Sequence, residues 1–167
     1  MVVSGADIQA GVDLVTGPNP PEYLGILNEP DGGFYDLPVY SPEEAAGLVQ
    51  PFLDAQTSTT YLSPAPAYPD SDWLPRFFEA CQCADRFPVV LAHVYSVDAQ
   101  GAIGLIQGVM DQFPGKTIWV TEISPASDPA QNCGLDNQGV AAWMSEIIGW
   151  AAQQPVVERI FWNCGEW

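Results

Sequence analysis

The sequence predicts an α/β fold built from parallel strands, in a single domain over residues 1–167. Short apolar runs alternate with longer amphipathic stretches at intervals of about 30 residues, which is typical of βαβ units. The expected strands are apolar throughout, as in sheets that helices cover or that close into a barrel. No linker, low-complexity stretch or run of charge divides the chain. We therefore expect one α/β domain.

The first half of the chain contains two apolar runs and three helix-start signals. Ser41 is the clearest signal, because it can serve as an N-cap while Pro42 fits the first turn and Glu44 completes a capping box. In chain order, this half predicts a helix over residues 6–15 with Ser4 and Asp7 as caps, a strand over 23–27, a helix from Ser41 to about Leu53, a strand over 59–62 and a helix that Asp72 caps.

The second half alternates more regularly. Ile103, Ile106 and Met110 recur at helical spacing after Asp98, a suitable N-cap. In chain order, this half predicts a strand over residues 89–92, a helix over 99–112, a strand over 117–121, a helix from Asn137 and a strand over 156–162.

The charge of the chain narrows the range of partners. With 21 Asp and Glu against 4 Lys and Arg, the net charge is −17. Such a chain repels phosphate backbones and anionic lipid, so we expect neither nucleic acid nor a membrane as partner. Six Trp, six Tyr and seven Phe supply flat faces for an uncharged ligand. One His excludes the usual Cys/His zinc spacing.

Composition also bears on location. The first residues have neither the basic region nor the apolar stretch of a secretory signal. High acidity, scarce Lys and abundant Trp nevertheless suit a secreted protein, and we expect an extracellular or cell-wall-associated location.

Two glutamates directly follow apolar strands, Glu29 after residues 23–27 and Glu122 after 117–121. Ligands of parallel α/β folds bind at the carboxyl ends of the strands. A carboxylate at a dry rim is costly unless it has a partner or a role, and no Lys or Arg lies at these ends. Two carboxylates about 5 Å apart are what retaining glycoside cleavage requires. The other strand ends hold residues 63–65, 93–95 and 162–163.

Several motifs, in order, resemble a known family. They are LGILNEPD at residues 24–31, SPAP at 63–66, WLPRFFEAC at 73–81, AHVY at 92–95 and IWVTE at 118–122. Together they resemble the fungal-type endo-β-1,3-glucanases of glycoside hydrolase family 128, over most of the chain. The resemblance implies a TIM-barrel-like (β/α) architecture. A full barrel takes about 250 residues, so we expect about five to six parallel strands, in a barrel that is incomplete or completed by a homodimer.

The resemblance also implies roles for individual residues. Glu29 would be the general acid/base and Glu122 the nucleophile, while Asn28 would bind the sugar 2-hydroxyl. His93 and Tyr95 would line the cleft and orient the substrate or the nucleophile. For Trp162 the implied role is a sugar-stacking platform. The resemblance implies no metal or other cofactor.

Alternatives remain at each position. The segment around Glu29 could be only a polar turn, Glu122 a solvated or capping residue, and His93 a structural histidine. For the whole chain, the expected activity is retaining hydrolysis of β-1,3-glucan, and the alternative is a β-glucan-binding protein without turnover.

Two disulfides are conceivable from the positions of the four cysteines, one between Cys81 and Cys83 and one between Cys133 and Cys164. Cys81 and Cys83 stand too close in sequence for an unstrained bridge. On the barrel that the resemblance implies, Cys133 and Cys164 follow adjacent strands, which favours a disulfide between them.

Overall fold

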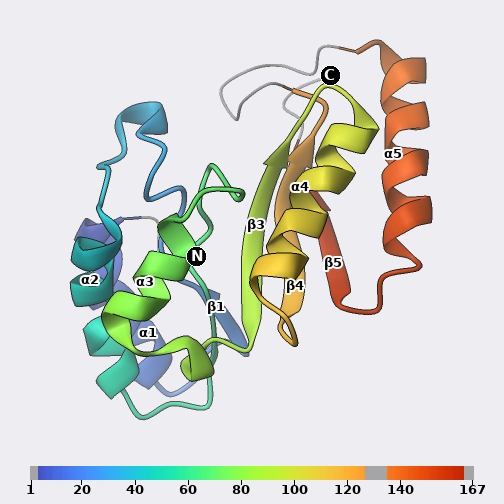
Figure 1. Cartoon of the computed structure of the whole chain (residues 1–167). Helices are drawn as coiled ribbons and strands as arrows, with labels where there is room; N and C mark the ends of the chain where they lie inside the picture. Colours follow the sequence, from blue (N-terminus) through green and yellow to red (C-terminus); the bar gives the residue numbers. More distant parts are fainter. Residues whose placement is uncertain (1–3, 127–134, 164–167) are drawn as a thin grey trace.

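The strands form one parallel sheet in which sequence order and spatial order agree. The computed structural model of the chain describes residues 4–126 and 135–163. The strands are β1 (Tyr23–Gly25), β2 (Thr60–Leu62), β3 (Val89–Tyr95), β4 (Thr117–Ser124) and β5 (Val157–Trp162), in the order β1-β2-β3-β4-β5. Every neighbouring pair is parallel, so all the carboxyl ends share one edge of the sheet. The predicted incomplete (β/α) architecture is confirmed, and the described residues form five strands in an open sheet (Figure 1).

Helices connect successive strands, as predicted. The connecting helices are α2 (Pro42–Asp54), α3 (Trp73–Cys81), α4 (Ala99–Gln112) and α5 (Asn137–Ala151), with the short 3-10 turns η2 (Phe34–Asp36) and η3 (Ala84–Arg86). The turn η1 (Gly5–Asp7) and the helix α1 (Ile8–Thr16) precede β1. In Figure 1, α1, α2 and α3 lie beside β1, whereas α4 and α5 lie beside β3 to β5.

The helix starts mostly follow the predicted caps. The Ser41 hydroxyl accepts a hydrogen bond from the Glu44 N–H at 3.2 Å, and Glu44 Oε2 accepts one from the Ser41 N–H at 2.8 Å. Asp72 is the exception, because its side chain makes no capping bond and the Ser71 hydroxyl accepts the Trp73 N–H at 3.4 Å instead. The prediction that the Asp72 side chain caps α3 was therefore wrong.

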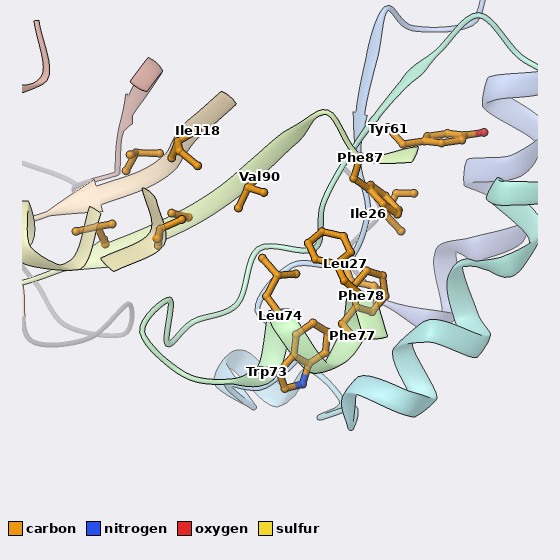
Figure 2. Packing of buried hydrophobic residues seen from close by; sticks show 14 of the residues in the cluster. Ile26, Leu27, Tyr61, Trp73, Leu74, Phe77, Phe78, Phe87, Val90 and Ile118 are labelled. Atoms are coloured by element: carbon orange, nitrogen blue, oxygen red, sulfur yellow. The ribbon is translucent and has the colours of Figure 1, made fainter. Parts of the chain in front are cut away.

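The outer face of the sheet packs against the helices. Val90, Ala92 and Val94 of β3 are buried there in one large apolar cluster. Figure 2 shows the aromatic part of this cluster, where the Phe77 ring lies 5.7 Å from that of Trp73 and 6.0 Å from that of Phe87. Burial of such rings is the main contribution that fixes α3 to the sheet.

The inner face is smaller and carries a second cluster: Leu62, Ala65, Val89, Leu91 and Trp119. Its largest member, Trp119, is covered by two side chains near the sheet edges. The Arg159 guanidinium lies 4.1 Å from the Trp119 ring centroid, and the Tyr23 ring lies 4.9 Å from it. Trp119 is therefore only 4% exposed although the sheet is open.

Two strands are longer than predicted. β3 continues through Tyr95 rather than ending at residue 92, and β4 continues through Ser124 rather than ending at 121. The extra residues include His93 and Glu122, which are paired in register. Polar side chains interrupt the apolar pattern there because the inner face carries them, while the backbone pairing continues.

The cysteine expectation also needs correction. Cys81 and Cys83 form a disulfide. Gln82 between them adopts a left-handed conformation (φ 52°), which turns the chain back at the end of α3 and brings the two Cα atoms to 5.1 Å. That separation lies within the usual range for a bridge. Cys133 and Cys164, the favoured pair, lie outside the described residues.

In the part of the chain that the structure describes, no helix is both long and apolar enough to cross a bilayer.

Candidate active site

The backbone at the end of β1 places Glu29 at the carboxyl edge of the sheet. Leu27 (φ 65°) and Glu29 (φ 44°) are both left-handed, a conformation that costs a non-glycine residue about 1–3 kcal/mol. Two backbone hydrogen bonds to the loop after β2 stabilise this conformation. The Glu29 N–H donates to the Ala65 carbonyl at 2.9 Å, and the Ala65 N–H donates to the Leu27 carbonyl at 3.1 Å. The Glu29 side chain is only 3% exposed.

Asp31 ties the loops after β1 and β2 together. Its carboxylate accepts hydrogen bonds from the backbone N–H groups of Ala67 at 2.7 Å and Tyr68 at 3.3 Å. Partial burial raises the pKa of Asp31 above its ordinary value, and these two bonds oppose the rise. The loop that carries Glu29 is therefore fixed from both sides.

His93 lies between the two glutamates. It projects from β3 and is fully buried, with Nδ1 2.8 Å from Glu29 Oε1 and 3.5 Å from Glu122 Oε2. Neutral imidazole can donate through Nδ1 to an ionised carboxylate or accept there from a protonated one. The contact between His93 and Glu29 is thus compatible with either state of the carboxyl group.

Glu122 is held by two donors on one oxygen. Its Oε2 accepts hydrogen bonds from the Tyr95 hydroxyl and from Asn163 Nδ2, the latter at 2.6 Å. Asn163 Nδ2 also lies 2.6 Å from the Tyr95 hydroxyl oxygen, which closes a triangle. Burial, and then the bond to Glu122, raise the pKa of Tyr95 far above its ordinary value. Tyr95 therefore remains a neutral donor.

The two carboxylates and the imidazole converge. One ligand atom from each of Glu29, His93 and Glu122 lies within 4.8 Å of the others. One nitrogen and two carboxylate oxygens are donors that a divalent cation accepts. Here Nδ1 already lies at hydrogen-bond distance from Glu29, so hydrogen bonding alone accounts for the arrangement. Chemically, it offers two carboxyl groups whose nearest oxygens lie within 4.8 Å of each other.

The structure brings together four of the six residues singled out in the sequence: Glu29, His93, Tyr95 and Glu122. Asn28 adjoins Glu29, and its backbone bridges to Ala65.

Trp162 lies elsewhere. Its ring is 5.9 Å from that of Trp143 of α5, on the outer face of the sheet, where it borders an apolar pocket with Ile123 and Ile160. This position does not support the expected sugar-stacking role. The faces of β5 could not be assigned by simple alternation, because its register with β4 shifts twice.

Sequence reasoning assigned no role to Asn163. It stands at a strand end, directly after β5 and beside the aromatic residue Trp162. The signal that could have found Asn163 is its position. A short amide at the end of a strand beside the Glu122 strand can reach the carboxylate.

The fold and the cluster together define a (β/α)-barrel-like protein with paired carboxylates at the carboxyl edge of its sheet. The chain belongs to the glycosyl hydrolase catalytic core family, whose model matches residues 5–166. No curated protein sequence matches it.

Solved structures of glycoside hydrolase family 128 share the fold, as the motifs predicted. An endo-β-1,3-glucanase from Amycolatopsis mediterranei, in complex with laminaripentaose, matches with TM-score 0.76 and 20% identity over 98% of this chain and 70% of its own. An oligosaccharide-binding protein from Trichoderma gamsii matches with TM-score 0.76 and 20% identity, over 99% of this chain and 68% of its own. An exo-β-1,3-glucanase from Cryptococcus neoformans matches with TM-score 0.68 and 24% identity, over 84% of this chain and 55% of its own. The chain thus spans between about half and about 70% of the length of these proteins.

Proposed function

We propose that the chain hydrolyses β-1,3-glucan with retention of anomeric configuration, using Glu122 as nucleophile and Glu29 as general acid/base. The observation that carries this proposal is the separation of the two carboxyl groups, whose nearest oxygens lie within 4.8 Å. Retaining enzymes place their carboxyls about 5–5.5 Å apart, whereas inverting ones need about 6.5 Å or more for a water molecule.

The environments of the two glutamates fit different roles. Two donors, Tyr95 and Asn163, hold Oε2 of Glu122, which leaves the second oxygen of this carboxylate to attack the anomeric carbon. Glu29 is buried against His93, which accommodates the carboxyl group with or without its proton. An acid that later acts as a base needs this property.

The reaction then proceeds in two displacements. In the first, Glu122 bonds to the anomeric carbon while Glu29 gives its proton to the glycosidic oxygen, and the bond between carbon and leaving oxygen breaks. In the second, Glu29 takes a proton from water, whose oxygen replaces Glu122 on the sugar. Asn28 would bind the sugar 2-hydroxyl. The neutral substrate agrees with a chain of net charge −17, and its location would be extracellular or cell-wall-associated, where glucan occurs.

A second candidate is a β-glucan-binding protein without turnover. Two observations favour it: the Trichoderma gamsii structure of the same fold is an oligosaccharide-binding protein, and the open five-stranded sheet supplies only part of a barrel wall. In that case the carboxylates would bind sugar hydroxyls.

The two candidates separate in one experiment. The wild type is expected to release reducing ends from laminarin, and Glu29→Gln and Glu122→Gln are each expected to lose at least about 1,000-fold of that activity. Glu79→Gln, an exposed residue of α3, is the matched control and should retain activity. Initial products observed by proton NMR should be β-anomers.

Binding of laminarin without release by the wild type would establish the second candidate instead. Cleavage of cellulose or mannan in place of laminarin would keep the mechanism and change the substrate.

A further inference from the structure

Two aromatic side chains lie side by side on the loops that follow β1 and β2. Phe34 belongs to η2 and Tyr68 to the loop after β2, and their ring centroids are 6.4 Å apart with the planes tilted by 51°. Tyr68 is 50% exposed, more than most of the aromatic side chains that the structure describes. We call the pair the aromatic ledge.

The ledge is held by the backbone rather than left mobile on the surface. Asp31 accepts the N–H of Tyr68, which fixes the residue at its main chain. Phe34 lies against Gly32, where a Cβ atom would come within 2.6 Å of the Phe34 ring. Gly32 therefore allows the Phe34 ring to approach the loop backbone closely. The Tyr40 N–H then donates to the Pro30 carbonyl at 2.7 Å, which closes the loop behind the ledge.

The ledge lies on the Glu29 side of the site. Both of its loops begin at the carboxyl ends of β1 and β2, and Glu29 is bonded to Ala65 at the start of the second loop. Glu122 comes from β4, which β2 and β3 separate from β1. Going along the carboxyl edge, a ligand that passes from Glu122 to Glu29 next meets these loops.

We propose that the aromatic ledge binds the leaving-group portion of a β-glucan, that is, the glucosyl units on the reducing side of the bond that breaks. The inference rests on the proposed function. A general acid protonates the leaving oxygen, so the departing chain lies on the side of that acid. Exposed rings offer apolar faces to the C–H faces of glucose, and a neutral sugar needs no charged partner.

The test compares two substrates, of which only one has glucosyl units on the leaving-group side of the bond that breaks. Laminarihexaose has leaving-group sugars, whereas laminaribiosyl fluoride leaves only fluoride. For Tyr68→Ala, the ratio of kcat/KM on laminarihexaose to that on the fluoride is expected to fall about 10-fold, because ring stacking is lost in one substrate only. Tyr68→Phe keeps the ring and should keep the wild-type ratio, and Leu14→Ala removes an equally exposed apolar side chain on α1 as a control.

The outcomes distinguish this inference from the function on which it rests. A wild-type ratio in Tyr68→Ala, or an equal loss on both substrates, overturns the ledge and leaves the hydrolase proposal standing. If the wild type binds laminarihexaose without cleaving it, the ledge is tested by calorimetry, and undiminished affinity in Tyr68→Ala overturns it. Absence of both cleavage and binding overturns both proposals.

Discussion

At the residue scale, the site is organised around one oxygen of Glu122. Oε2 accepts from both Tyr95 and Asn163, and these two donors also contact each other. The side chain of Glu122 is 24% exposed, so water competes for it. Two directed donors restrict its orientation more than solvent does, and the raised pKa of Tyr95 keeps that donor protonated.

Removal of either donor is therefore expected to lower kcat. A hydrogen bond to a charged group contributes about 1.5–3 kcal/mol, so Tyr95→Phe and Asn163→Ala should each reduce kcat on laminarin by about 10- to 100-fold. The KM should change little if these residues position Glu122 rather than bind sugar. Steady-state kinetics measure both quantities, with thermal unfolding as the check on folding. Wild-type kcat in both variants would show that Glu122 is oriented in another way.

The site was predicted from the sequence in part, and the successes and failures have physical causes. The two glutamates could be found because parallel strands must deliver their carboxyl ends to one edge. Asn163 received no role because its contacts come from side chains 41 and 68 positions away along the chain, which no local pattern records. The stacking role expected for Trp162 has no support in its packing against Trp143, and the register shifts between β4 and β5 make the faces of β5 hard to assign from the sequence.

At the element scale, local signals predicted where elements begin better than where they end. The capping box at Ser41 fixed the start of α2, since both of its bonds lie within four residues. By contrast, β3 and β4 continue past their first polar residues, because the backbone pairing continues where the inner face carries the polar side chains of the candidate site. The turn at Gln82 that permits the Cys81–Cys83 bridge is a left-handed non-glycine residue, for which the sequence has no strong marker.

Asp31, which connects the loops after β1 and β2, is expected to make the free energy of unfolding depend on pH. Burial raises the pKa of Asp31 above 3.8, so the folded state holds its proton more tightly than the unfolded state. The contribution of Asp31 to the free energy of unfolding is therefore greatest below pH 3.8, where the carboxyl group is protonated in both states. It falls as the pH rises through the folded-state pKa. Asp31→Asn does not titrate, and its free energy of unfolding relative to the wild type should increase from pH 3.5 to about 6.

Urea unfolding of the two proteins across this range measures the difference, in which the other titrating groups cancel. The variant loses one carboxylate acceptor for the Tyr68 N–H, which shifts the difference by a constant. A difference that is flat or decreases with pH would contradict the assignment.

At the scale of the whole molecule, an open sheet would expose the apolar side chains of its inner face to water. The outer face is covered by helices, but among residues 4–126 and 135–163 no further strand contributes side chains to the inner face. Here the problem is reduced by two residues at opposite edges of the sheet, Tyr23 on β1 and Arg159 on β5, which meet over Trp119. Glu158 Oε2 also accepts the Trp119 indole N–H at 2.6 Å. These contacts keep the largest inner residue from water without a second wall.

This arrangement makes Arg159 more important to stability than an ordinary exposed arginine. Its guanidinium lies over two rings, 4.1 Å from the centroid of Trp119 and 5.5 Å from that of Tyr23, and its stem covers apolar surface. Arg159→Ala is expected to lower the Tm by about 3 °C and to shift the tryptophan emission to longer wavelength, since the indole of Trp119 becomes solvated. Arg76→Ala is the matched control, because its pair with Glu43 is exposed on both sides and such pairs contribute little. Equal Tm changes in the two variants would mean that the open inner face is stabilised by the sheet and its other side chains, and that the contact across its edges is incidental.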